Sequence, residues 1–177
     1  ALGFGDVAGG SRRVARLLCD LGVAPGDPVL VMLPRIPAWS QVVLGALEAG
    51  ALVIPCSTIL RPKDVAYRAA HSGAVAVVAT AENTGTVDAV RGGMPALRHY
   101  LLWRGDGALA EGWTDLEAAL GKTEPAPPHR PTRASDPALV YYPSGTTGPP
   151  KAVLHAHAYT AAQRLTAQYW HGLREAE

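Results

Sequence analysis

The first part of the chain alternates between apolar residues at helical spacing and short, unbroken apolar runs. One apolar stripe stands at positions i, i+3, i+4 and i+7 and consists of Val14, Leu17, Leu18 and Leu21. This spacing predicts a helix, with Ser11 as its expected N-cap and Gly22 just past its end. Residues 29–33 are all apolar and follow a Pro-Gly-Asp turn, which is typical of a strand covered on both faces.

The same alternation continues to residue 103. It predicts further helices at 37–48, 62–71 and 86–91, and further strands at 52–54, 75–79 and 99–103. Strands that alternate with helices over such lengths form βαβ units. The expected fold class is therefore α/β, with a mostly parallel sheet.

The composition changes after residue 121. The segment 122–137 is rich in proline, which predicts an extended linker along the surface. Beyond it we expect strands at 138–142 and 152–155, joined by a loop, and a helix at about 158–170. The expected buried stripe of that helix holds Leu165, Tyr169 and Trp170.

The chain is accordingly expected to have three parts. Residues 1–121 would form a partial βαβ subdomain, residues 122–137 the linker, and residues 138–177 the incomplete start of a next subdomain. The first residues carry no visible signal peptide and no initiator Met. We therefore expect a piece of a longer protein that resides in the cytoplasm.

Charge and hydropathy exclude two classes of partner. The formal net charge is +1 and no basic run stands out, so we expect no nucleic-acid partner. The longest apolar runs, 49–56 and 74–81, are much shorter than the ~20 residues of a membrane-spanning helix. No membrane span is therefore expected.

The cysteines and histidines indicate neither a disulfide nor a metal site. Cys19 and Cys56 each stand in an apolar run and are expected to be buried free thiols. His155 and His157 would point to the same face of a strand, but a metal site would need a third ligand, and none is indicated.

The segment 141–155 carries the most informative chemistry. Its candidate binding residues are two glycines, three hydroxyl residues and a lysine: Ser144, Gly145, Thr146, Thr147, Gly148 and Lys151. Glycines let main-chain N–H groups turn toward an anion and leave room for it. The hydroxyl groups add donors, and the lysine adds a compact positive charge. This mixture suits a polyphosphate.

Two better-known loops do not fit the spacing. A Walker loop requires Gly before the lysine and Ser or Thr after it, whereas Pro150 and Ala152 flank Lys151. A hydrolase nucleophile elbow requires Gly two residues before the serine, whereas Tyr142 stands there. A surface hairpin that is merely rich in Ser, Thr and Gly would not reproduce the nearly complete signature described next.

The segment resembles the phosphate-binding signature of the adenylate-forming enzymes, which include acyl-CoA synthetases, peptide-synthetase adenylation domains and luciferases. That signature is roughly [YF]-[TS]-S-G-[ST]-T-G-x-P-K-G-V-x-H. The chain matches it at Tyr142, Ser144, Gly145, Thr146, Thr147, Gly148, Pro150, Lys151, Val153 and His155. It departs at Pro143, where a hydroxyl residue is usual, and at Ala152, where Gly is usual.

Other segments extend the resemblance over nearly the whole chain. Residues 33–39, 44–51, 61–68 and 166–174 are similar to stretches of the medium-chain acyl-CoA synthetases. The resemblance implies that these residues form part of the large N-terminal domain of an adenylate-forming enzyme, with the phosphate loop between two strands.

The resemblance also implies an activity. Such enzymes use ATP, with Mg²⁺, to activate a carboxylic acid as an acyl-adenylate, and then transfer the acyl group to coenzyme A. Residues 144–148 would hold the β- and γ-phosphates, and Lys151 would add positive charge. The family's catalytic lysine is expected outside this chain, so the fragment is expected to be inactive without the remainder of the enzyme.

Two alternatives stay open at this point. The chain could belong to the adenylation domain of a peptide synthetase, although segment 33–39 favours the fatty-acyl branch. It could also be a truncated nucleotide-binding chain without catalytic activity.

Overall fold

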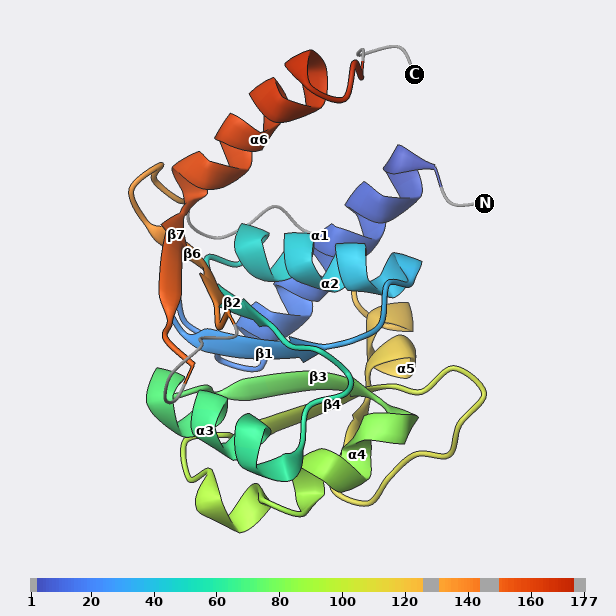
Figure 1. Ribbon diagram of the computed structural model, residues 1–177. Coiled ribbons are helices and arrows are strands. Elements are labelled where there is room, and N and C mark those ends of the chain that lie inside the picture. The colour runs from blue at the N-terminus through green and yellow to red at the C-terminus, as the bar shows by residue number, and fades with distance from the viewer. Residues whose placement is uncertain (1–2, 126–130, 144–149, 174–177) are drawn as a thin grey trace.

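The computed structural model describes residues 3–125, 131–143 and 150–173. Within these residues one seven-stranded sheet has the order β5-β4-β3-β1-β2-β6-β7 (Figure 1). The strands are β1 Pro28–Met32, β2 Leu52–Pro55, β3 Ala76–Thr80, β4 His99–Trp103, β5 Thr114–Asp115, β6 Pro137–Tyr141 and β7 Val153–Ala156. Every pair is parallel except β6 with β7. The predicted α/β class with a mostly parallel sheet is confirmed.

Helices cover both faces of the sheet. They are α1 Phe4–Asp20, α2 Pro37–Glu48, α3 Pro62–Ser72, α4 Ala81–Asp88, α5 Leu116–Gly121 and α6 His157–Tyr169, with a short 3-10 turn, η1, at Arg91–Gly93. Helices α1, α2 and α5 pack on one face, and α3 and α4 pack on the other (Figure 1). No helix in the described residues is long and apolar enough to cross a membrane.

The central strand β1 contributes to both apolar layers. Val29 and Val31 face α1 and α2, whereas Leu30 and Met32 face α3. All four side chains are buried. An unbroken apolar run is what a parallel strand covered on both faces requires, so this part of the sequence pattern reports directly on the architecture.

Helices α1 and α2 cross at very close range. A Cβ atom added at Gly45 of α2 would overlap the carbonyl oxygen of Ser11 and approach the Cβ of Val14 to 2.6 Å. The two main chains can approach this closely because Gly45 has no side chain. This crossing holds α1 against α2, and both helices pack on the same face of β1.

Ser11 is not the N-cap that the sequence predicted. Helix α1 begins two turns earlier, where the main-chain N–H of Gly3 donates to the Asp6 carboxylate over 2.9 Å. Ser11 is buried in the helix, and its hydroxyl donates to the Val7 carbonyl over 2.8 Å. That local bond satisfies a serine inside a helix, so the residue type alone did not mark a helix start.

Three elements between residues 80 and 121 also differ from the prediction. The helix expected at 86–91 lies at Ala81–Asp88, directly after β3. Strand β5 and helix α5 were not predicted, because they hold two and six residues and are too short to establish a period. The N-cap of α5 is Asp115, whose carboxylate accepts from the Ala118 N–H over 2.9 Å.

The described part of the proline-rich segment contains no helix or strand before Pro137. Strand β6 then pairs in parallel with β2, with Leu139 beside Val53. Residues on both sides of this segment therefore contribute to one sheet. The division into subdomains at 121 and 137 stays a prediction.

Helix α6 is present as predicted, but its expected buried stripe is wrong. It extends from the sheet edge beyond β7 (Figure 1), and its described residues include no buried side chain. Leu165, Tyr169 and Trp170 are 59%, 79% and 83% exposed. The spacing of apolar residues identified the apolar face of the helix, but it did not establish that another element packs on that face.

Candidate functional site

The connections from β1 and β2 run to opposite faces of the sheet. Strand β1 leads to α2 on one face, and β2 leads to α3 on the other. Where the connections that follow two neighbouring parallel strands run to opposite faces of the sheet, a crevice opens beyond the carboxyl ends of those strands, and ligands of α/β proteins bind there. The topology therefore locates a candidate site before any residue type is considered.

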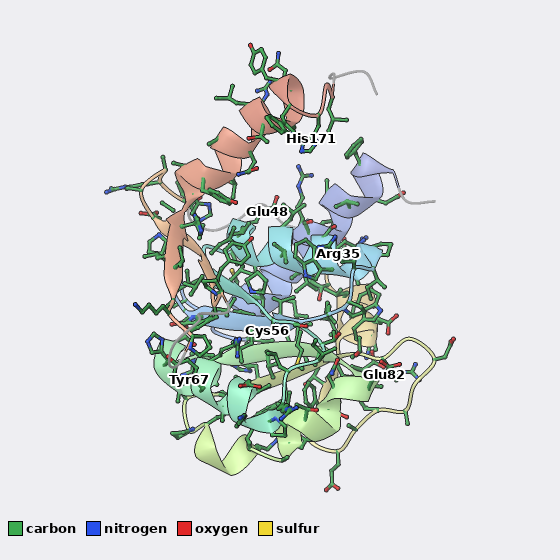
Figure 2. All side chains as sticks on the ribbon, viewed as in Figure 1. Arg35, Glu48, Cys56, Tyr67, Glu82 and His171 are labelled. Carbon is green, nitrogen blue, oxygen red and sulfur yellow. The ribbon has the colours of Figure 1, made fainter. Side chains whose placement is uncertain are left out.

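A crevice of about 1090 Å³ lies at this point. Its walls are residues 33–37 after β1, residues 55–58 after β2, the start of α2, and Tyr141 at the end of β6. Figure 2 labels Arg35 between β1 and α2, and Cys56 just after β2. Among the described residues that line the crevice, Arg35 is charged and none is acidic, which favours an anionic ligand.

The predicted phosphate loop joins two strands at this same edge. Strand β6 ends at Tyr141, and its antiparallel partner β7 begins at Val153. Of the predicted site residues, Ser144, Gly145, Thr146, Thr147 and Gly148 lie outside the described residues. Lys151 is described, and it is exposed two residues before β7.

Two consecutive tyrosines at the end of β6 face opposite sides of the sheet, as alternation along an extended strand requires. Tyr141 lines the crevice on the α2 side, and its ring lies 5.5 Å from the His155 ring. His155 also lies 4.2 Å from the Tyr159 ring. His155 therefore packs between two aromatic rings.

Tyr142 turns toward α3 on the other side. Its hydroxyl lies 2.9 Å from Nδ1 of His71, and the imidazole tautomer decides which group donates. The Arg68 guanidinium carbon is 5.3 Å from the centre of the Tyr142 ring. Burial, and then the nearby Tyr67, raise the pKa of the Tyr142 phenol, so the group is uncharged at neutral pH and remains a hydrogen-bonding phenol.

Sequence reasoning missed a contact on the far side of the loop. The Tyr67 hydroxyl donates to the main-chain carbonyl of Pro150 over 2.9 Å. These residues are 83 positions apart, and no local pattern links them. The available signal was the match of segment 61–68 to acyl-CoA synthetases, which identified Tyr67 and Arg68 without giving either a role.

The described residues offer no ready site for a metal ion. They contain no group of three or more His, Cys, Asp or Glu side chains arranged to hold one. Mg²⁺ takes oxygen ligands and commonly binds substrate phosphates with one or two carboxylates.

The chain matches known proteins along almost its entire length. The family model described as AMP-binding enzyme covers residues 1–176. The rat mitochondrial acyl-coenzyme A synthetase ACSM2 is 33% identical over 171 residues, which are 96% of this chain and 30% of that protein. The chain thus spans less than a third of that relative's length.

Solved structures agree with this match. An acyl-CoA synthetase from Brucella canis is 29% identical, with a TM-score of 0.86, over 98% of this chain and 31% of that one. An anthranilate CoA ligase, AuaEII, solved with anthranoyl-AMP, is 27% identical, with a TM-score of 0.86, over 94% of this chain and 31% of that one. Because both its sequence and its fold match those of these proteins, the chain belongs to the AMP-binding enzyme family.

Proposed function

We propose that this chain is the ATP-phosphate-binding portion of an AMP-forming acid–thiol ligase. The observation that carries the proposal is the position of the two strands that the predicted loop connects. A segment of small hydroxyl residues, glycines and Lys151 connects β6 to β7, and Tyr141 at the end of β6 lines the crevice beyond the carboxyl ends of β1 and β2. A polyphosphate requires such donors and positive charge, without a nearby carboxylate that would repel it.

The proposed reaction has two steps. A substrate carboxylate oxygen attacks the α-phosphorus of ATP, which forms an acyl-adenylate and releases pyrophosphate. The thiol of coenzyme A then attacks the acyl carbonyl carbon, loses its proton, and releases AMP. The thioester keeps the acyl group, so no oxidant or reductant is needed.

The residues of this chain would act in the first step. Main-chain N–H groups and hydroxyl groups of residues 144–148 would bind the β- and γ-phosphates, and Lys151 would offset the charge of the departing pyrophosphate. This is positioning and electrostatic stabilisation, without a covalent intermediate on this chain. The family's catalytic lysine is proposed to lie outside the chain, and Mg²⁺ would accompany ATP through its phosphates.

The acyl-CoA branch is the better supported one. The rat relative is named as an acyl-coenzyme A synthetase, and the solved AuaEII structure contains anthranoyl-AMP, an adenylate of a carboxylic acid. We therefore favour the acyl-CoA branch over a peptide synthetase that activates an amino acid. We propose a medium-chain acid because residues 33–39, 44–51, 61–68 and 166–174 resemble stretches of the medium-chain acyl-CoA synthetases. We also propose a cytoplasmic location, while the rat relative's own name refers to mitochondria.

The reaction is tested by pyrophosphate release. The protein encoded by the whole reading frame that contains these residues would be supplied with ATP, coenzyme A and carboxylic acids of two to sixteen carbons or an amino-acid panel. We expect pyrophosphate to appear with the acids of two to sixteen carbons and not with the amino acids, most rapidly near medium chain length. Acyl-CoA should follow when coenzyme A is present. Release that depends on an amino acid would favour the peptide-synthetase alternative. Absence of release with every acid would favour a nucleotide-binding chain without catalysis.

A further inference from the structure

One face of α3 contacts both flanks of the candidate phosphate loop. Tyr67 and His71 lie one turn apart on this helix, at positions i and i+4, so their side chains project on the same side. Their ring centres are 5.5 Å apart. Figure 2 labels Tyr67 on α3.

The contact after the loop acts on the main chain. The Tyr67 hydroxyl donates to the carbonyl oxygen of Pro150 over 2.9 Å. That oxygen belongs to the same planar peptide unit as the N–H of Lys151. A bond that fixes the oxygen therefore fixes the plane from which Lys151 projects.

The contact before the loop surrounds one aromatic ring. The Tyr142 ring meets the His71 ring edge-on at 5.7 Å and the Tyr67 ring edge-on at 6.2 Å. Its hydroxyl is 2.9 Å from the His71 Nδ1. Buried Arg68 adds its guanidinium over the same ring and donates to the Asp64 carbonyl of its own helix over 2.9 Å. Tyr142 is thereby held two residues before Ser144.

These contacts have a consequence for ligand binding. A binding residue whose main chain is free to move loses conformational entropy when it binds a ligand, and that loss weakens binding. Holding residues 142 and 150 against one rigid helix removes part of the loss before the ligand arrives. The strands β6 and β7 alone fix the flanks only as far as Tyr141 and Val153, the last residue pair of their ladder.

We propose that Tyr67, Arg68 and His71 form a positioning cluster that holds Tyr142 and the Pro150 carbonyl so that the Pro150–Lys151 peptide presents Lys151 to the ATP phosphates. The inference rests on the proposed function, because it presumes that the loop binds ATP. Tyr67 is a positioning residue in this account. It acts through the Pro150–Lys151 peptide and does not touch the nucleotide.

Removal of one hydroxyl group tests the cluster. Tyr67→Phe keeps the ring contacts with Tyr142 and His71 and loses the bond to Pro150. We expect the dissociation constant for ATP, measured by calorimetry on the 177-residue chain, to rise by about three- to tenfold, the range typical of one lost hydrogen bond. Tyr169→Phe is the matched control, because Tyr169 is 79% exposed on α6, and it should leave the constant unchanged.

A double-mutant cycle separates positioning from general destabilisation. If Tyr67 acts by placing Lys151, then Tyr67→Phe should weaken ATP binding by less than about twofold in a Lys151→Ala background, since coupled residues are not additive. Equal effects of Tyr67→Phe in the two backgrounds would overturn the inference, as would wild-type affinity in the single variant. A wild-type chain that binds no ATP would instead overturn the proposed function on which the inference rests.

Discussion

The close crossing of α1 and α2 gives a quantitative prediction about stability. Gly45→Ala would add a Cβ atom that overlaps the Ser11 carbonyl oxygen and lies 2.6 Å from the Cβ of Val14. Both obstructing atoms belong to or adjoin the main chain of α1, so no flexible side chain can move aside. Overpacking of this kind costs about 1–3 kcal/mol, and the better helix propensity of alanine returns about 0.5–1 kcal/mol.

We expect the net loss to be about 2 kcal/mol, because a main-chain obstruction belongs near the upper end of the overpacking range. For a chain of this size that corresponds to a melting temperature lower by roughly 4–8 °C. Thermal unfolding followed by circular dichroism, with urea unfolding at 25 °C, would measure both quantities. The slope of the urea curve should stay the same, since the fold is retained.

Gly85→Ala is the matched control for this substitution. Gly85 also lies inside a helix, α4, but an added Cβ atom there would meet nothing within 4 Å. We expect this variant to be more stable by about 0.5–1 kcal/mol. Stability of Gly45→Ala equal to or above that of the wild type would contradict this close packing, because α1 and α2 would then have room at their crossing.

Three further predictions concern buried thiol and indole groups. Burial raises the pKa of the Cys56 thiol to about 12, so at pH 8 an alkylating reagent should modify half-buried Cys19 faster than Cys56 in the folded chain. Peptide mass spectrometry would measure the two rates, and equal rates would contradict the burial of Cys56. Because the folded pKa of Cys56 exceeds the unfolded value of 9.0, the contribution of this thiol to stability is intact below pH 9 and is lost as pH rises from 9 toward about 12, by up to about 1.4 kcal/mol per pH unit. Over that range, the free energy of urea unfolding should fall more steeply for the wild type than for Cys56→Ala, and parallel curves would contradict this expectation. Trp113 donates from Nε1 to the Asp88 carboxylate over 3.1 Å, so Trp113→Phe should lower the free energy of thermal unfolding by about 1–2 kcal/mol. Trp170→Phe, at an 83% exposed position, should cause no measurable change, and equal losses in the two variants would contradict the packing of Trp113.

Most of the parallel sheet could be predicted because its signals are local. The run predicted as a strand at 29–33 lies at Pro28–Met32, and the helix predicted at 37–48 has those same bounds. Pro37 begins that helix because its fixed φ and missing N–H suit a first helical turn. Unbroken apolar runs and proline-marked helix starts need only neighbouring residues to be recognised.

The elements that could not be predicted depend on distant residues or on very few residues. The exposure of Trp170 on α6 follows from what packs on that helix, and the sequence of α6 does not contain that information. The bond from Tyr67 to Pro150 joins residues 83 positions apart. Hydrophobic periodicity reports which face of an element is apolar, whereas only the assembled fold reports what that face contacts.

For the candidate site, sequence and structure contribute different parts. The glycine, hydroxyl and lysine pattern predicts that residues 144–151 bind phosphate. The structure adds the two strands that flank this segment, β6 and β7, and the crevice that Tyr141 lines at the end of β6. The structure also shows that α3 contacts the residues on both sides of this segment, Tyr142 and Pro150.

ATP would be titrated by calorimetry into the purified 177-residue chain and, in parallel, into a Thr147→Ala, Lys151→Ala double variant. We expect weak, saturable binding to the wild type and a loss of affinity of roughly tenfold or more in the double variant, with unchanged circular dichroism spectra. A folded wild-type chain that binds no ATP even at millimolar concentration, or a double variant that binds as tightly as the wild type, would contradict the claim that this loop holds the phosphates of ATP.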